Sequence, residues 1–458
     1  MDVSFLLGPD APDGAPAVVW HDRPLPHGWL REAVAAWGPR LDALGIAPGT
    51  VVSVESDHGP ETYALLLALI ARDAIAAPLP RDAEATGALG SHLERRIVLD
   101  PDERWRTPAL TAPPPGAAGP PGPDPHPLIA RLRAGRRPGW VLRTSGSSGR
   151  PKHVVHDLGA LLERFRRPRR PLRMVALLAF DHLGGLSTML HALASGGTLV
   201  VVPDRRPDTV CAAVARHRPQ VLPASPTFLR LMLLAGAHER FDLGSLRQVT
   251  YGAEPMSAAT LRRLRAALPD VTLKQTYGLI EVGIVASRSR DDDSLWLALD
   301  IPHRVVDGML ELRTPSAMLG YLDAPSPFTA DGFLVTGDRV ERDGGELRIL
   351  GRASELINVG GEKVWPQEVE AVVEEVEGIA DVEVYGEPHA LVGSVVCARI
   401  RPVEGTEPST LVRNVRRHCH ARLARHQVPV RIRVTDEEPR QWRGKRMRGP
   451  QGAGPWPG

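Results

Sequence analysis

The sequence predicts an α/β protein with a large N-terminal domain, built of mainly parallel sheets and helices, and a small α+β domain at the C-terminal end. The chain has 458 residues, 43% hydrophobic and 24% charged, which is enough to bury a large core in two or more domains. From residue 139 onward, short β-branched or apolar runs alternate with amphipathic stretches, as in proteins with parallel strands and intervening helices. After about Arg352 this alternation of apolar runs and amphipathic stretches changes. We therefore predict domains at residues 1–352 and 353–458.

The order of the elements follows from their residue patterns. Residues 108–127 are rich in proline and glycine and predict an exposed loop, either an insertion within one domain or a linker between domains. Apolar and β-branched runs after that loop predict strands at 140–143, 173–180, 198–202, 220–222, 248–251 and 272–276. An amphipathic helix is predicted at 257–267. In the smaller domain the patterns predict a helix at 366–376, strands at 379–385 and 394–401, and a helix at 409–424.

The charge balance argues against nucleic acid and membranes as partners. Fifty-six basic residues against 54 acidic ones leave a formal charge of +2, too small to attract a polyanion to the whole chain. The apolar stretches are interrupted by charged residues, the first residues lack the basic region of a signal peptide, and the three cysteines are widely spaced. These features predict a cytoplasmic protein without disulfide bonds.

Lysine is scarce in this chain. Only four of the 56 basic residues are lysines, at positions Lys152, Lys274, Lys363 and Lys445. An ammonium group is a compact point charge, whereas a guanidinium group is a broad fork. A lysine that persists among so many arginines therefore indicates a position where a point charge is needed.

One of these lysines ends a loop rich in glycine and hydroxyl groups. Residues 144–152, TSGSSGRPK, directly follow a predicted strand. Glycines let backbone N–H groups approach phosphate oxygens closely, hydroxyls add donors, and Lys152 supplies positive charge. The segment predicts a phosphate-binding loop, and the alternative is a flexible Ser/Gly loop without a ligand.

This segment also resembles the phosphate loop of the adenylate-forming superfamily, which includes acyl-CoA synthetases, adenylation domains and luciferases. Further segments resemble motifs of that family and occur in the family's order. They are YGAEP at 251–255, QTYGLIE at 275–281, TGD at 336–338, GR at 351–352, NVGGEKVWPQEVE at 358–370 and PRQWRGK at 439–445. Each match is short, and the ordered set identifies the chain as a member of the superfamily.

The resemblance implies a reaction in two steps. A carboxylic acid reacts with ATP to give an acyl-adenylate and pyrophosphate, and a thiol then displaces AMP. The implied cofactors are ATP and Mg²⁺, and the thiol belongs to CoA or to the phosphopantetheine of an acyl carrier protein. Residues 413–448 hold twelve basic residues against three acidic ones, a charge that suits either CoA phosphates or an acidic carrier.

The family motifs imply a role for each matching residue. The nucleotide site would comprise Thr144, Ser145, Gly146, Ser147, Ser148, Gly149, Lys152, Gly252, Ala253, Glu254, Tyr277, Gly278, Asp338 and Arg352. Tyr277 would stack on adenine, Asp338 would accept the ribose hydroxyls, and Arg352 would reach ribose or phosphate. Glu281 would hold Mg²⁺, and Lys445 would neutralise the carboxylate and the α-phosphate in the first step.

The resemblance also implies an acyl pocket and a thiol tunnel. Asp181, His182 and Gly252 would line the acyl pocket, with His182 as a gating histidine or, alternatively, Asp181 as the acid that binds an α-ammonium group. Asn358, Gly360 and Gly361 would line the tunnel for pantetheine, after the mobile C-terminal domain rotates about residues 352–354.

Two positions depart from the family pattern. Ile280 stands where the family usually has a threonine that bonds the α-phosphate, and Ser354 stands where the hinge usually carries Asp or Lys. Three readings therefore stay open: a ligase that forms thioesters, a ligase that forms amides or other N-acyl products, and a nucleotide-binding relative with impaired turnover. The acid is equally open among fatty, aromatic and amino acids.

Overall fold

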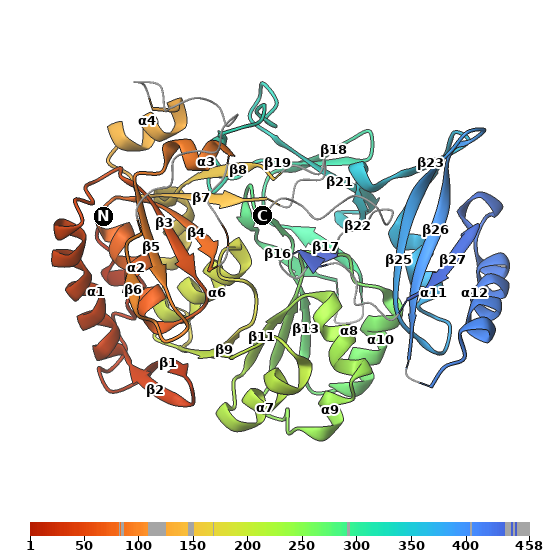
Figure 1. Cartoon of the computed structure of the whole chain (residues 1–458), viewed down its shortest axis with the longest axis horizontal. Coiled ribbons are helices and arrows are strands. Elements are labelled where there is room, and N and C mark those ends of the chain that lie inside the picture. Colours follow the sequence, from red (N-terminus) through yellow and green to blue (C-terminus); the bar gives the residue numbers. More distant parts are fainter. Residues whose placement is uncertain are drawn as a thin grey trace.

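A computed structural model describes residues 1–81, 83, 87–108, 125–144, 151–167, 169–290, 294–403, 405–435, 441–442 and 445–446. Its sheets and helices form a large N-terminal part, and a smaller sheet with two helices lies at one end (Figure 1). Most of the predicted loop at 108–127 and part of the basic C-terminal tail lie outside the described residues.

The first seven-stranded sheet has the order β13-β12-β11-β9-β10-β1-β2. All its neighbouring pairs run parallel except β1 and β2 at one edge. The strands are β1 (Pro16–Trp20), β2 (Arg23–Pro26), β9 (Arg173–Ala176), β10 (Thr198–Val201), β11 (Val221–Ala224), β12 (Gln248–Tyr251) and β13 (Thr272–Gln275).

The second seven-stranded sheet has the order β20-β8-β7-β4-β3-β5-β6, with a parallel centre and antiparallel edges. Every residue of its strand β3 is buried, as expected of a parallel strand covered on both faces. The strands are β3 (Val51–Ser56), β4 (Ile75–Pro80), β5 (Arg95–Leu99), β6 (Trp105–Arg106), β7 (Gly139–Arg143), β8 (His153–Asp157) and β20 (Gly320–Tyr321).

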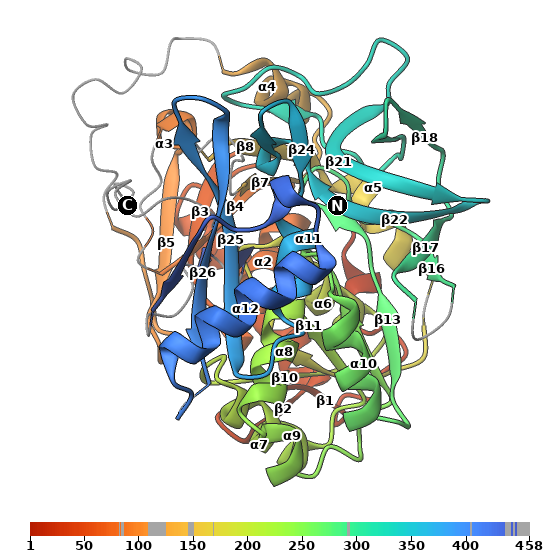
Figure 2. The ribbon, with the colours of Figure 1, turned by 90° about the vertical axis from the view of Figure 1, so that its right-hand side faces the viewer.

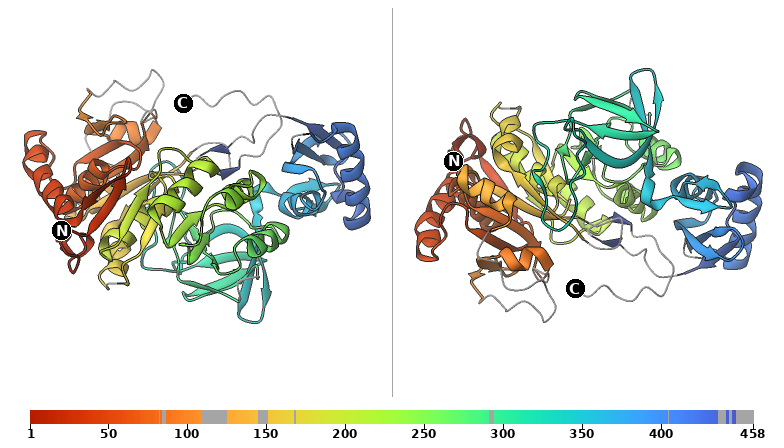
Figure 3. Two further views of the ribbon diagram at one scale, coloured as in Figure 1. Left: turned by 90° about the horizontal axis from the view of Figure 1, so that it is seen from below. Right: turned by 90° about the horizontal axis from the view of Figure 1, so that it is seen from above.

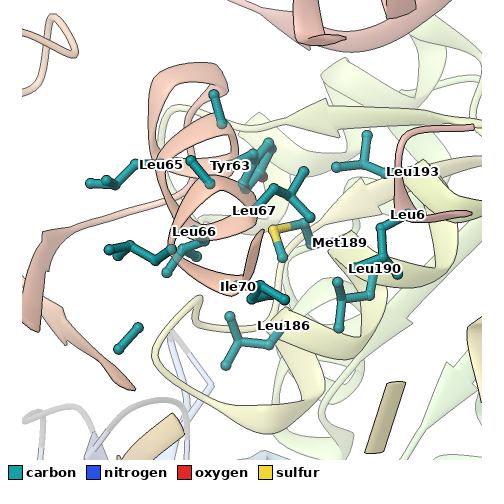
Figure 4. Close-up of a cluster of buried hydrophobic side chains, with 14 of the residues drawn as sticks. Leu6, Tyr63, Leu65, Leu66, Leu67, Ile70, Leu186, Met189, Leu190 and Leu193 are labelled. Atoms are coloured by element: carbon teal, nitrogen blue, oxygen red, sulfur yellow. The ribbon is translucent and has the colours of Figure 1, made fainter. Parts of the chain in front are cut away.

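Two apolar helices form much of the core of this part. In α2 (Pro60–Ala71) and α6 (Leu183–Ala194) most residues are buried, as expected of helices with no solvent-facing side. Figure 4 shows Leu67 and Ile70 of α2 close to Leu186 and Met189 of α6. The other helices of the large part are α1 (His27–Ala43), α3 (Gly87–His92), α4 (Pro127–Ala134), α5 (Leu158–Leu162), α7 (Pro207–His217), α8 (Pro226–Leu234), α9 (Ala237–Arg240) and α10 (Ala258–Ala267).

The third sheet of the large part has six strands and is antiparallel throughout. The residue patterns did not single it out, because its strands mix buried and exposed positions instead of forming apolar runs. The strands, in sheet order, are β16 (Ser287–Ser289), β17 (Trp296–Leu299), β22 (Glu346–Arg352), β21 (Leu334–Asp343), β19 (Met309–Leu312) and β18 (His303–Val306). A small hairpin, β14 (Gly278–Leu279) and β15 (Gly283–Ile284), precedes it.

The C-terminal sheet has five strands and a hydrophobic core of its own, whose buried residues all fall between Ile357 and Val428. Figure 2 shows helix α12 lying across this sheet. The elements are β23 (Ile357–Val359), β24 (Glu362–Val364), α11 (Pro366–Val373), β25 (Ile379–His389), β26 (Gly393–Pro402), α12 (Pro408–Arg422) and β27 (Arg431–Val434). A separate core supports the division at 352/353, which we retain as a proposal.

The predicted strands and helices correspond to observed ones with small shifts at their ends. The largest shifts are at 173–180, where strand β9 already ends at Ala176, and at 379–385, where strand β25 continues to His389. Across the residue ranges given above, no helix combines the length and the apolar character needed to span a membrane.

A buried carboxylate caps the amino end of helix α2. Glu103 accepts hydrogen bonds from the backbone N–H of Glu61, and from the N–H and hydroxyl of Thr62, each of these two at 3.0 Å. Burial raises the pKa of Glu103 to about 7, although the hydrogen bonds act in the opposite direction. The folded chain therefore binds a proton at this carboxyl over a pH range in which the unfolded chain has released it.

We predict that Glu103→Gln removes a pH-dependent term from the free energy of unfolding. The unfolded carboxyl titrates at 4.5 and the folded one at about 7, so its stabilising effect is complete below pH 4.5 and is lost as the pH rises through 7. The term is on the order of 3 kcal/mol at most. Urea unfolding between pH 5 and 8 measures it, with the exposed neighbour changed in Asp102→Asn as the control. Parallel profiles for the wild type and Glu103→Gln would contradict the prediction.

Candidate active site

A cleft of about 920 Å³ opens between the large part and the C-terminal sheet. Its floor is made where strands β12 and β13 end, since Tyr251 and Gln275 are register partners at the carboxyl ends of these parallel strands. Ligand sites of open α/β sheets lie at this edge. The predicted site residues that line the cleft are Thr144, Lys152, His182, Ala253, Glu254, Tyr277, Gly278, Glu281, Asp338 and Arg352.

Three of these side chains form one group, held together by a hydrogen bond and an ion pair. The Tyr277 hydroxyl donates to Asp338 Oδ2 at 2.5 Å, and Arg352 Nε lies 2.8 Å from Asp338 Oδ1. Burial and the neighbouring Asp338 carboxylate raise the pKa of Tyr277 well above its usual value, so its hydroxyl keeps its proton and acts as a donor. The Asp338 carboxylate is thus fixed at the wall of the cleft.

The antiparallel sheet places this group. Asp338 on β21 and Arg352 on β22 are register partners across the two strands. The Thr336 hydroxyl donates to the Leu310 carbonyl at 2.7 Å and accepts from the backbone N–H of Asp338 at 3.0 Å. Strand pairing, and not side-chain contact alone, therefore fixes the distance between the carboxylate and the guanidinium.

A second group surrounds Tyr321, a residue that belongs to none of the motif segments. The Tyr321 hydroxyl donates to Glu281 Oε1 at 2.8 Å, and the ammonium of Lys152 lies 5.1 Å from the centre of the Tyr321 ring. Burial, followed by the Glu281 carboxylate, raises the pKa of Tyr321. Tyr321 thus contacts both a cation, through its ring, and an anion, through its hydroxyl. Opposite charges placed side by side in the cleft suit a phosphate group with its metal ion.

The two ends of the predicted phosphate loop are hydrogen-bonded to each other. Thr144 N–H donates to the Lys152 carbonyl at 2.8 Å, and Lys152 N–H donates to Thr144 Oγ1 at 3.1 Å. The residues between them that we expected to bind phosphate, Ser145, Gly146, Ser147, Ser148 and Gly149, lie outside the described residues.

A histidine on strand β8 forms a hydrogen bond to the backbone next to Glu281. His156 Nε2 donates to the Ile280 carbonyl at 2.6 Å, and the Glu281 carbonyl accepts from Met318 N–H at 2.7 Å. Burial lowers the pKa of His156 to about 4, so the imidazole is neutral near pH 7. The side chain of Ile280 lines the cleft and offers no hydrogen-bond donor at this position.

The segment 252–254 is tightly fitted. A Cβ atom on Gly252 would lie 2.5 Å from the Thr276 carbonyl oxygen, and Ala253 has a φ of +70°, a conformation that side-chain-bearing residues rarely adopt. Glu254 Oε2 accepts from the Thr227 hydroxyl at 2.7 Å, which joins this segment to helix α8. Gly252 itself supports the cleft without lining it.

Of the two candidate residues for the acyl pocket, His182 lines the cleft and Asp181 is buried beside it. The turn before them is held by His58, whose Nε2 contacts the Leu178 carbonyl at 2.6 Å. This placement favours His182 as the residue that meets an acyl group, and we retain its role as a proposal.

The residues expected to line a thiol tunnel lie elsewhere. Asn358, Gly360 and Gly361 form the turn between β23 and β24, where Asn358 Oδ1 accepts from Gly361 N–H at 3.0 Å, and none of them lines the cleft. Lys445 lies in a short hairpin of β28 (Gln441–Trp442) and β29 (Lys445–Arg446). Figure 3 places this hairpin against the middle of the large part, away from the C-terminal sheet.

Comparison with known proteins assigns the family. A model described as AMP-binding enzyme matches residues 9–322, and one described as AMP-binding enzyme C-terminal domain matches residues 368–445. The chain belongs to the AMP-binding enzyme family. The family matches confirm the predicted resemblance to the adenylate-forming superfamily. The α/β fold predicted for this AMP-binding enzyme family member, with a small C-terminal domain, is also confirmed.

Individual relatives of this AMP-binding family member are distant. A CoA ligase of Mycobacterium tuberculosis, named for an octahydroindenyl propanoyl group, is 32% identical over 328 residues, which are 67% of this chain and 64% of that relative. The chain thus spans less than two thirds of that relative's length. Among solved structures, the anthranilate CoA ligase AuaEII aligns with a TM-score of 0.79, 20% identity and coverage of 97% and 95%. The amide bond synthetase McbA from Marinactinospora thermotolerans aligns with a TM-score of 0.75, 23% identity and 95% coverage of both chains.

Proposed function

We propose that this protein uses ATP to convert a carboxylic acid into an acyl-adenylate, with release of pyrophosphate, and transfers the acyl group to the thiol of CoA. One observation supports this most strongly: a single cleft contains both the Tyr277–Asp338–Arg352 group and the Lys152–Tyr321–Glu281 group. The first group offers an anion to sugar hydroxyls, and the second offers opposite charges to phosphate and metal. The M. tuberculosis relative is named as a CoA ligase.

Each group has a defined part in the proposed chemistry. Asp338 accepts the two ribose hydroxyls of ATP, and Lys152 neutralises phosphate oxygens as charge builds on the departing pyrophosphate. Glu281 would be the carboxylate ligand of Mg²⁺, which supplies a Lewis acid to the phosphates when bound. An oxygen of the substrate carboxylate attacks the α-phosphorus, and the bond to pyrophosphate breaks. In the second step the thiol sulfur attacks the acyl carbon, AMP leaves, and the thiol proton is released.

The acceptor is the point on which the alternatives differ. A carrier-protein thiol requires the same second step as CoA, whereas an amine gives an amide. We place CoA first because two of the relatives, from Mycobacterium tuberculosis and Aromatoleum aromaticum, are named as CoA ligases. McbA, which shares the fold, is named as an amide bond synthetase, so an amine belongs among the acceptors to be tested.

The proposed function is tested by exchange of labelled pyrophosphate into ATP over a panel of fatty, aromatic and amino acids. Exchange that depends on one class of acid is the expected result. CoA, a phosphopantetheinylated carrier and simple amines are then offered to the enzyme with that acid. If no acid in the panel supports exchange while AMP still binds, the chain is a nucleotide-binding protein without this turnover.

We predict that Ile280→Thr accelerates exchange about tenfold. A threonine hydroxyl at this position would add one hydrogen bond to a charged α-phosphate, on the order of 1.5 kcal/mol. The control is Ile280→Val, which keeps the branched shape and lacks the hydroxyl. Equal rates in the threonine and valine variants would show that the missing donor does not limit the reaction.

A further inference from the structure

A buried arginine connects the large part of the chain to the C-terminal sheet. Arg230 lies on helix α8, and its side chain is 7% exposed. One guanidinium nitrogen lies 3.2 Å from Glu374 Oε1, and another contacts the Asp381 carboxylate. The side chains of Glu374 and Asp381 are 13% and 3% exposed, and they come from the end of helix α11 and the start of β25.

The same helix forms a wall of the cleft. Thr227 and Arg230 are three positions apart in α8 and therefore lie on one face of it. Thr227 bonds Glu254 in the predicted nucleotide site, and Arg230 bonds the C-terminal sheet. Arg230 and Glu374 both line the cleft, so their ion pair is part of its wall.

These ion pairs fix a particular orientation of the C-terminal sheet. In this orientation, the turn at Asn358 and Gly361 lies outside the cleft. The hairpin that contains Lys445 lies against the large part (Figure 3). In the proposed reaction Lys445 serves the first step and the Asn358–Gly361 turn serves the second. The observed orientation therefore matches the first step.

We propose that Arg230 is a positioning residue for adenylation: by pairing with Glu374 and Asp381 it holds the C-terminal sheet in the orientation that brings Lys445 to the cleft, and it releases both carboxylates before thiol transfer. This inference rests on the proposed function. Ion pairs suit such a contact because all three groups are well hydrated when they separate, so the attraction that is lost is largely offset by the water that is regained.

The first test measures the orientation and needs no turnover. Exposed residues of the two parts are replaced in Arg263→Cys and Arg417→Cys, and spin labels at both report their separation in the full chain. The native Cys211, Cys397 and Cys419 are buried, and burial raises their pKa values to about 12, 11 and 11, so they react slowly. One main distance is expected, and Arg230→Met should broaden or shift it. An unchanged distribution in Arg230→Met would overturn the proposal.

The second test separates the two steps, with an acid that supports exchange. Arg230→Met should slow pyrophosphate exchange about tenfold and leave the reaction of a synthetic acyl-adenylate with the thiol at least as fast as in the wild type. Equal losses in both steps would indicate a merely structural role and overturn the proposal. The control is Arg240→Met, which removes an exposed ion pair with Asp208 on the neighbouring helix. Swapping the charges in the double variant Arg230→Asp with Asp381→Arg should restore exchange.

Discussion

Asp338→Asn is expected to raise the KM for ATP about 100-fold while changing kcat by only a few-fold. The carboxylate of Asp338 accepts a hydrogen bond from Tyr277 and pairs with Arg352, so its position is fixed before ATP arrives. Two hydrogen bonds from ribose hydroxyls to a charged acceptor contribute on the order of 3 kcal/mol together, about a hundredfold in affinity. Ribose takes no part in bond breaking. The variant should therefore lose the same binding energy in the ground state and in the transition state, which raises KM and leaves kcat nearly unchanged.

Calorimetry of AMP binding measures the same change without turnover. The matched control is Asp331→Asn, because Asp331 also pairs with an arginine, Arg304, but is exposed and lies away from the cleft. Both variants should be checked for thermal unfolding, since Asp338→Asn also removes the ion pair with Arg352. If AMP binds Asp338→Asn as tightly as the wild type, the ribose does not contact this carboxylate.

Lys445→Ala and Lys445→Arg are both expected to slow pyrophosphate exchange by about 100-fold to 1000-fold, the effect of removing one preorganised group that stabilises developing charge. The arginine variant keeps the charge, but a guanidinium spreads it over a broad fork that cannot meet the carboxylate and the α-phosphate at one point. Exchange in the arginine variant close to the wild-type rate would show that charge alone suffices here.

The adjacent Arg446 provides the control. Lys445 and Arg446 are consecutive basic residues of strand β29. Arg446→Ala therefore removes a cation from the same strand without removing the proposed catalytic group, and exchange should stay within a few-fold of the wild type. Equal losses in Arg446→Ala and Lys445→Ala would assign the effect to the basic tail as a whole.

Local sequence was sufficient to predict the two strands that end at the floor of the cleft. The strands at 248–251 and 272–276 are short apolar or β-branched runs bounded by turn residues, and they match β12 and β13 closely. The carboxyl ends of these parallel strands share an edge, so the segments that follow them, with Gly252 and Tyr277, begin side by side. The nucleotide-binding role of the two segments was implied by their resemblance to family motifs and not by the strand pattern.

Tyr321 and His156 could not be predicted in the same way. Tyr321 reaches Glu281 only because β20 pairs with β8 from far along the chain, in a register where Tyr321 lies opposite Val154. His156 acts through a backbone carbonyl, and a histidine within a buried strand has the same local pattern whether it supports a site or merely fills a core. Strands β21 and β22 were missed because their polar residues hide the alternation that identifies a strand.

The first seven-stranded sheet also determines how this chain can fold as it is synthesised. Val18 of β1 lies opposite Leu199 of β10, and the strands β3 to β8, which come between them in sequence, belong to the other sheet. A nascent chain must therefore expose the hairpin of β1 and β2 until residue 199 has emerged from the ribosome. Such delayed pairing lowers folding rates and leaves an open strand edge available to other chains. Production of the intact protein should accordingly benefit from slow synthesis at low temperature, while fragments that end before β10 should aggregate.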